Sequence, residues 1–366
     1  MSTPFELVVC ITSTALFDCN ESHKIWEREG LEAYQEHQHA RVIIPMKPGV
    51  GFPLVQSLLE LNKIAGKHLV EVILVSRNDG DSGERVRHSI THYKLPITRM
   101  SFTAGTDVTK YLPAWKCDLF LSTEEDQVRT VLTSTNGNIF EGIAAALVCS
   151  IRDETITTEL NCSTDDETMA VHNLPEFVSL PQWPEGQVRI VFDGDGVLFS
   201  DEAEHIFHTQ GLTAFNQSEQ EKGHIPLPKG PMQAFALKLQ KVRRALEDVN
   251  SWRVRTFLVT ARDREAIKRV YRTLQEWDLE IDEKHFLGGL DKTPILRAID
   301  PAIYFDDSTD HIQRAKQHVP AAHVVYGAKN IQASSYTIES KTRTTVPEDE
   351  NARCNRTEQQ ALKTTH

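Results

Sequence analysis

The sequence contains no apolar run long enough to cross a membrane, although 40% of its 366 residues are hydrophobic. A membrane-spanning helix needs about 20 consecutive, mainly apolar residues. The apolar patch within residues 1–18, MSTPFELVVCITSTALFD, also lacks the basic region that opens a signal peptide. We therefore predict that this patch forms a first β-strand, and we predict no membrane partner.

Cysteine pairs and a basic surface are absent as well. The six cysteines are scattered without the CxxC spacing of a zinc site, and a chain of this size does not need disulfide bonds for stability. These features favour a reduced protein in the cytoplasm. The net charge of −12 argues against a nucleic-acid partner, because proteins that bind nucleic acid usually carry a basic face.

The sequence does contain a regular alternation of strand-like and helix-like segments. Runs rich in Val, Ile and Leu are followed by amphipathic stretches such as 232–247 and 264–277. This alternation is typical of a parallel sheet covered by helices on both faces, which predicts the α/β class. The predicted strands are 7–12, 70–76, 119–121, 188–192, 255–259 and 302–305.

Composition indicates how the chain is divided. Residues 151–186 are acidic and rich in Ser and Thr, then rich in Pro, and we interpret them as a linker. Residues 331–366 are polar and charged with little apolar periodicity, which predicts a disordered tail. The linker separates residues 5–150 from residues 187–330, so two domains are expected.

The two halves resemble one another in sequence. ILVSRNDGDSGERV at 73–86 aligns with FLVTARDREAIKRV at 257–270, and IIPMKPG at 43–49 aligns with HIPLPKG at 224–230. Two further pairs begin at residues 16 and 198 and at residues 119 and 303. All four pairs keep the same order at offsets of 181 to 184 residues, which indicates an internal duplication of one domain.

Polar side chains follow three predicted strands of the second half. Asp193 and Asp195 come directly after strand 188–192, in VFDGDGVLFS. Thr260 follows the next strand, and Asp306 and Asp307 end the strand in IYFDD. Because the carboxyl ends of parallel strands meet at one edge of a sheet, where ligands of open α/β proteins bind, we expect these side chains to converge.

Four converging carboxylates are costly to bury unless cations compensate them. Lys292, in GGLDKTP at the start of a predicted helix, supplies one positive charge. A hard divalent cation such as Mg²⁺ is the obvious second partner. Taken alone, a DxD pair is more often a surface turn, and Asp263 in TARD fits the N-cap of the following helix.

The order DxD, Thr, Lys, DD resembles the haloacid dehalogenase superfamily of phosphohydrolases, from residue 188 to about residue 326. The resemblance implies two tandem Rossmann-like domains of three layers. It implies that Asp193 is a nucleophile that forms an aspartyl-phosphate, and that Asp195 is a general acid and base, held protonated by its neighbours. Thr260 would bind phosphoryl oxygens, and Lys292 would balance charge. The implied ligands of Mg²⁺ are Asp193, Asp195, Asp306 and Asp307.

Residues 198–250 leave the predicted sheet and return to it, which matches a small cap insertion of this superfamily. Caps select the substrate. An aromatic ring in the cap could stack on a base, and Lys229 could meet a phosphate. The alternative, which we favour for each ring singly, is that Phe207 and Phe215 form the core of the cap. The candidate substrate contacts are His205, Phe207, His208, Phe215 and Lys229.

The whole pattern is similar to the cytosolic 5′-nucleotidase I family over about residues 6–327, in VFDGDGVLFSDEAE, HIPLPKGP, FLVTARD, FLGGLDKTPIL, YFDDS, LVSRND, LFLSTEEDQV and GIAAAL. The resemblance implies Mg²⁺-dependent hydrolysis of nucleoside 5′-monophosphates such as AMP or IMP in the cytoplasm. It also implies a homo-oligomer and a nucleoside di- or triphosphate as activator.

The first half lacks the residues of this chemistry. Ile11 and Ser13 align with the two aspartates of DxD, and Val108 aligns with the lysine. Ser122 and Thr123 align with the DD pair. We interpret this half as a structural, catalytically inactive copy. The alternative is a regulatory nucleotide site lined by Thr12, Ser13, Thr14, Ser76 and Arg77.

Other functions remain open. A phosphatase of the same superfamily that acts on a sugar phosphate would differ mainly in its cap. A nucleotide-binding sensor with little turnover would not need a nucleophile, so the intact motif set argues against it. An oligomerising scaffold would fit the duplication but would explain none of the second-half residues.

Overall fold

The computed structural model describes residues 5–80, 83–133, 139–149, 184, 186–327 and 330, except for the side chains of residues 204, 207, 208, 212 and 216. The elements below lie in one compact unit, Met1–Ala328. The remaining unit, Lys329–His366, includes Asn330 as its one described residue. The predicted tail 331–366 and nearly all of the predicted linker 151–186 therefore lie outside the described residues.

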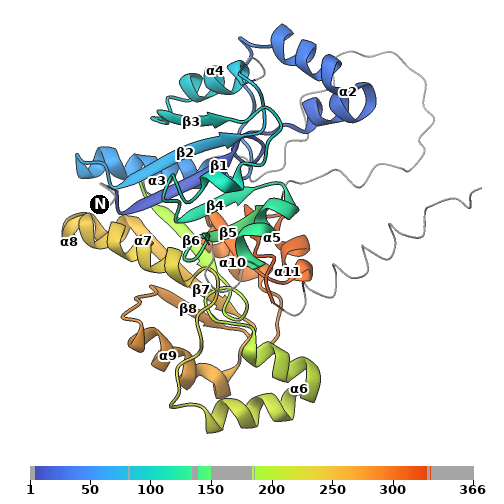
Figure 1. Ribbon diagram of the computed structural model, residues 1–366. Coiled ribbons are helices and arrows are strands. Elements are labelled where there is room, and N and C mark those ends of the chain that lie inside the picture. Colours follow the sequence, from blue (N-terminus) through green and yellow to red (C-terminus); the bar gives the residue numbers. More distant parts are fainter. Residues whose placement is uncertain are drawn as a thin grey trace, which may run out of the picture. The chain divides into compact units, whose positions relative to one another are not determined.

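Helices and strands alternate along both halves of the chain, as the hydrophobic pattern predicts (Figure 1). The first half contains β1 (Leu7–Thr12), α1 (Ser13–Leu16), α2 (Asn20–Ala40), α3 (Phe52–Ala65), β2 (Val70–Ser76), α4 (Glu84–His92), β3 (Arg99–Phe102), β4 (Leu119–Ser122), α5 (Glu125–Thr133) and β5 (Ala144–Val148). The second half contains β6 (Val188–Phe192), α6 (Glu202–Glu221), α7 (Gln233–Ala245), α8 (Glu247–Asn250), β7 (Val254–Thr260), the short helix η4 (Arg264–Ala266), α9 (Ile267–Glu276), β8 (Glu283–Phe286), α10 (Thr293–Ile299), β9 (Ile303–Asp306), α11 (Thr309–Ala315) and β10 (Ala321–His323).

The strands form one sheet of ten, in the order β3-β2-β1-β4-β5-β10-β9-β6-β7-β8. Neighbouring strands are parallel except at the junction of β5 and β10, which pair antiparallel. The α/β class is therefore confirmed. Read outward from this junction, β5-β4-β1-β2-β3 and β10-β9-β6-β7-β8 follow the same pattern. Each strand of the first half therefore has a counterpart five strands further along the chain.

Helices cover both faces of the sheet because successive side chains of a strand point to opposite faces. In β1, Leu7 and Val9 belong to the hydrophobic cluster that contains side chains of α3 and α7. Val8 and Cys10 belong to the cluster that includes side chains of α5. Strands that are buried on both faces read as continuous apolar runs, which is why the sequence pattern located them.

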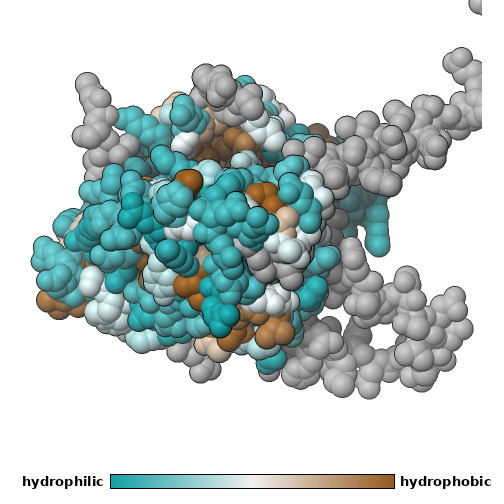
Figure 2. Space-filling model, turned by 90° about the horizontal axis from the view of Figure 1, so that it is seen from below, coloured by the Kyte–Doolittle hydropathy of each residue, from teal (hydrophilic) through white to brown (hydrophobic). Residues whose placement is uncertain are grey.

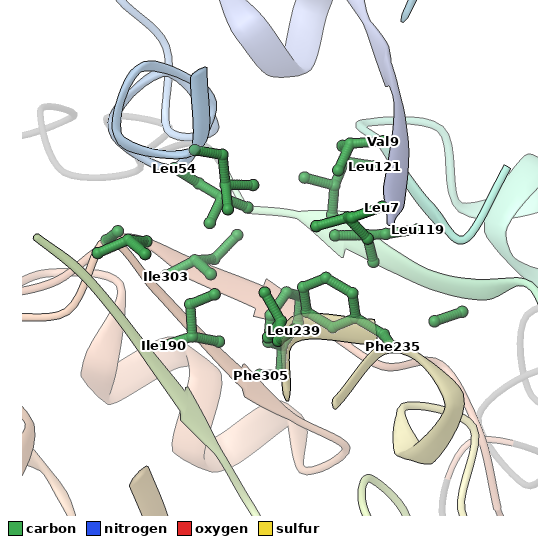
Figure 3. Close-up of a cluster of buried hydrophobic side chains, with 14 of the residues drawn as sticks. Leu7, Val9, Leu54, Leu119, Leu121, Ile190, Phe235, Leu239, Ile303 and Phe305 are labelled. Carbon is green, nitrogen blue, oxygen red and sulfur yellow. The ribbon is translucent and has the colours of Figure 1, made fainter. Parts of the chain in front are cut away.

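The two halves share a single hydrophobic core. Figure 3 shows side chains of both halves in one cluster: Leu7, Val9, Leu54, Leu119 and Leu121 from the first half lie with Ile190, Phe235, Leu239, Ile303 and Phe305 from the second. The sequence did not predict this continuity between the two expected domains. It also means that α7, from the later part of the predicted cap 198–250, packs onto the sheet through Phe235 and Leu239.

The face shown in Figure 2, which is the underside of the view in Figure 1, is mainly hydrophilic, with small and separate hydrophobic patches. Among the helices that the structure describes, none combines the length and the hydrophobicity that a membrane span requires. The described cysteines, Cys10, Cys19, Cys117 and Cys149, carry free thiols.

Candidate active site

Three neighbouring strands bring together residues that lie up to 114 positions apart in the sequence. β6 lies between β9 and β7, with Phe192 paired to Phe305 on one side and to Leu258 on the other. The backbone N–H of Asp193 donates to the carbonyl of Phe305 at 2.9 Å, which places Asp193 beside the end of β9. The predicted convergence of Asp193, Thr260, Asp306 and Asp307 at one sheet edge therefore follows from the strand order.

The loop that contains DxD passes tightly over these strand ends, and glycine makes this possible. A Cβ on Gly194 would lie 3.0 Å from Thr260 Oγ1, and a Cβ on Gly196 would lie 2.5 Å from Asp307 Oδ2. Gly196 also has a φ of +72°, which disfavours other residues. The two glycines thus allow the loop backbone to contact the hydroxyl and the carboxylate directly.

Replacement of Gly196 by Ala is expected to weaken metal binding as well as folding. The positive φ should cost about 1 kcal/mol of unfolding free energy, and the new methyl group must also displace the Asp307 carboxylate. Gly66→Ala is the matched control, because Gly66 has a φ of +62° and open space around its Cβ position. Thermal unfolding and calorimetric Mg²⁺ titration would compare the two variants. Equal metal affinity in both would contradict a role for Asp307 in metal binding.

Lys292 reaches this cluster from the loop after β8. This loop lies against the end of β7, because the Leu287 N–H donates to the Thr260 carbonyl at 3.0 Å. Asp291 then accepts from the N–H of Thr293 at 3.1 Å, which sets up the first turn of α10. The buried Lys292 Nζ lies 2.7 Å from Asp193 Oδ1 and 2.6 Å from Asp306 Oδ2.

The charges of this cluster act strongly on one another because all are buried. Burial raises the pKa of Asp193 to about 6, against the opposing effect of Lys292. Burial also disfavours the charged form of Asp306, but Lys292 and His311 outweigh it and hold the pKa of Asp306 below its ordinary value. Asp193 and Asp306 in turn outweigh the burial of Lys292 and raise its pKa.

The donor set fits a divalent cation. Three carboxylates, from Asp193, Asp306 and Asp307, are buried here, and Lys292 contacts the first two, so negative charge remains for a cation to compensate. Carboxylate oxygens are the ligands that hard cations such as Mg²⁺ take. Ligand atoms of Asp193, Asp306 and His311 all lie within 4.8 Å of one another, which makes this group a candidate metal centre.

Asp195 differs from the other three aspartates because its side chain is directed at an arginine. Arg262 Nε donates to Asp195 Oδ2 at 2.8 Å, and Nη2 donates to Oδ1 at 2.7 Å. A bidentate contact of this kind fixes the position and orientation of the Asp195 carboxylate. Of the four predicted metal ligands, Asp193 and Asp306 contact Lys292, whereas Asp195 contacts Arg262.

Sequence reasoning missed several residues that contact the site. Tyr304 donates to Asp306 Oδ2, and His311 Nδ1 lies 3.1 Å from the same oxygen. The strand period of two could have identified Tyr304, because residues i and i+2 share a face of the sheet. Arg262 was within the quoted motif TARD, but its partner on α6, Glu219, lies 43 positions away, and no local pattern connects them.

The predicted substrate contacts lie in different surroundings. Phe215 is buried with Ala203 and Ala266, and its ring lies 5.7 Å from the guanidinium carbon of Arg262, so it packs between α6 and η4. His205 and Lys229 are exposed. The side chains of Phe207 and His208 lie outside the described residues, although their backbone belongs to α6. Asp263 does cap a helix, accepting from the N–H of Glu265 at 3.0 Å.

The corresponding edge of the first half holds a cluster of hydroxyl groups in place of the carboxylates. Ser13 Oγ lies 3.0 Å from Ser76 Oγ, and Thr14 Oγ1 lies 3.2 Å from Thr12 Oγ1. Arg77 Nε donates to the carbonyl of Gly105 at 3.3 Å. The hydroxyls of the predicted regulatory site thus bond to one another, and Arg77 contacts the loop after β3.

Comparison with known proteins identifies similar sequences. The family model described as 5′-nucleotidase matches residues 1–331. Cytosolic 5′-nucleotidase 1B from Homo sapiens is 33% identical over 321 residues, which cover 85% of this chain and 47% of that protein. The chain therefore spans about half the length of this curated relative. No solved structure matches the chain significantly.

Proposed function

Because the chain belongs to the 5′-nucleotidase family, we propose that it hydrolyses nucleoside 5′-monophosphates to nucleoside and inorganic phosphate. The observation that carries the proposal is the contact of Lys292 with Asp193 and Asp306, at 2.7 and 2.6 Å, beside the further carboxylate of Asp307. A buried carboxylate that is fixed by a lysine at the end of a strand is suited to attack phosphorus.

The proposed reaction has two steps. A carboxylate oxygen of Asp193 attacks phosphorus while the bond to the 5′-oxygen breaks. Asp195, which enters this step protonated, gives that oxygen its proton, so the nucleoside leaves. Water then attacks the aspartyl-phosphate, Asp195 accepts the proton of the water, and phosphate leaves. Thr260 and Lys292 bind the phosphoryl oxygens. When bound by Asp193, Asp306 and Asp307, Mg²⁺ would offset the negative charge of the carboxylates and the phosphoryl group.

We also propose that the two halves arose by duplication and that the first half is catalytically inactive. Matching details support this proposal beyond the strand order. Helices α2 and α6 are both interrupted by a glycine of positive φ, Gly30 at 85° and Gly211 at 82°, which are 181 positions apart. Location in the cytoplasm, a homo-oligomeric state and a nucleotide activator stay predictions from the resemblance.

Phosphate release from a panel of substrates would test the proposed function. We expect release from AMP or IMP that requires Mg²⁺ and stops when a chelator is added. The panel would include pyrimidine nucleotides, deoxynucleotides and sugar phosphates at equal concentration. Release from sugar phosphates alone would contradict the nucleotidase function but keep the phosphatase chemistry. Tight nucleotide binding without any release would favour the sensor.

A further inference from the structure

A continuous chain of ion pairs connects helix α6 to the active site. Asp195 binds Arg262 through two hydrogen bonds, and Arg262 Nη1 donates to Glu219 Oε2 at 2.5 Å. The other carboxylate oxygen of Glu219 accepts from Arg269 Nη1 at 2.7 Å. The side chains of Arg262, Glu219 and Arg269 are at most 2% exposed, so water does not screen these contacts.

Aromatic rings further restrict the guanidinium of Arg262. Its central carbon lies 5.9 Å from the centre of the Phe199 ring and 5.7 Å from that of Phe215. Asp195 and Glu219 outweigh the effect of burial and raise the pKa of Arg262, so this side chain stays charged. The position of Arg262 is therefore determined by Glu219 on one side and by two rings, and Arg262 in turn determines where the Asp195 carboxylate lies.

The first half shows which of these contacts the fold requires. Arg85 aligns with Arg269 at an offset of 184, and Gln38 aligns with Glu219 at an offset of 181. Arg85 donates to Gln38 Oε1 at 3.3 Å and to the Ile44 carbonyl at 3.0 Å. Arg269 likewise donates to Glu219 and, at 3.0 Å, to the Ile225 carbonyl. In both halves an arginine therefore connects the helix interrupted by glycine, α2 or α6, to the loop after it. We call this pair of contacts the arginine brace.

The contact to the active site is present in the second half only. Asn78 stands at the position of Arg262, and its side chain accepts from Tyr34 at 3.3 Å. The charge of Glu219 is absent as well, since Gln38 takes its place. The half that lacks the catalytic carboxylates thus also lacks Arg262 and the charge of Glu219, although its brace is intact. A buried ion pair is a poor source of stability, so retention for folding does not explain the pair.

We propose that Arg262 and Glu219 are positioning residues for Asp195: Glu219 holds the guanidinium of Arg262 from helix α6, and Arg262 orients the Asp195 carboxylate. This inference rests on the proposed function, because Asp195 is the proton donor and acceptor of that reaction. Arg262 and Glu219 do not contact the substrate; they act through Asp195. The link also connects α6, in the predicted cap, to the chemical steps.

Substitutions that reproduce the first half test this role without disrupting the fold. The double variant Glu219→Gln/Arg262→Asn carries the pair that the first half has, Gln38 and Asn78, and the brace to Arg269 can remain. We expect kcat for AMP to fall about 100-fold with KM nearly unchanged, because misplacement of about 1 Å has effects of this size on the chemical step. Glu219→Gln alone should lower kcat about 10-fold. Gln38→Glu is the matched control, with kcat unchanged, because it makes the reverse change at the aligned position and keeps an acceptor for Arg85.

The leaving group provides a readout that a purely structural role would not change. p-Nitrophenolate leaves without a proton, so its release in a single turnover does not need a correctly placed Asp195. We therefore expect the double variant to lose far less of this rate than of the AMP rate, at a similar melting temperature. Equal losses with both substrates, or wild-type kcat in the double variant, would overturn the positioning role. If the wild-type protein releases phosphate from neither substrate, the proposed function itself fails.

Discussion

Replacement of Asp193 by Asn is expected to abolish phosphate release, with a loss in kcat of at least about 10⁴-fold. The amide has nearly the shape of the carboxylate but cannot form the aspartyl-phosphate. Because Lys292 also contacts Asp306 at 2.6 Å, the lysine keeps one carboxylate partner in the variant. The expected loss therefore reflects missing nucleophilic attack rather than a collapsed site.

Two measurements would separate the nucleophile from a group that only binds. Acid quenching during turnover of phosphorus-labelled AMP should leave label on the wild-type protein and none on Asp193→Asn. Asp300→Asn is a suitable control, because Asp300 precedes β9 and thus lies at the amino end of the strand, away from the candidate site. Its φ of 51° is also one that Asn adopts readily. Residual activity of Asp193→Asn within 100-fold of wild type would argue for direct attack by water.

Replacement of Lys292 by Met should cause the largest loss of stability. The variant leaves the buried carboxylates of Asp193 and Asp306 without their lysine. Breaking a buried ion pair in this way costs about 3–5 kcal/mol. Denaturant unfolding at pH 7.5 would measure the loss. Lys63→Met is the control, because the exposed pair of Lys63 with Glu60 should contribute less than about 1 kcal/mol.

The pH dependence of the Lys292→Met variant has a definite sign. In the wild-type protein the pKa of Asp193 is already raised from 3.8 to about 6, and Lys292 lowers it. Without the lysine this pKa should rise further, so the folded state binds a proton more tightly than the unfolded state. The free energy of unfolding of the variant then falls as pH rises from the unfolded pKa of Asp193 to its raised pKa in the folded state. The loss should therefore shrink towards pH 5 and grow towards pH 8, and added Mg²⁺ should recover part of it. A loss that is independent of both pH and Mg²⁺ would contradict this account.

Much of the fold could be predicted from local patterns. The apolar runs identified β1, β2 and β6 with their observed bounds, and β4, β7 and β9 to within one residue at each end. The strands that were missed are short: β3 and β8 lie at the sheet edges and are partly polar, and β5 and β10 are rich in alanine, which has little preference for strands. Their pairing depends on neighbouring strands rather than on their own residues.

The sequence by itself determined the α/β class, the similarity of the two halves and the residues at the strand ends of the candidate site, because these features have short-range signatures. Only the tertiary structure decided that both halves share one sheet and one core, since the β5–β10 pairing joins segments more than 170 residues apart. It also decided that Asp195 faces Arg262 and that Glu219 holds Arg262 from α6. Such contacts depend on where separate elements meet, and the local sequence around a buried charge does not indicate which residue will pair with it.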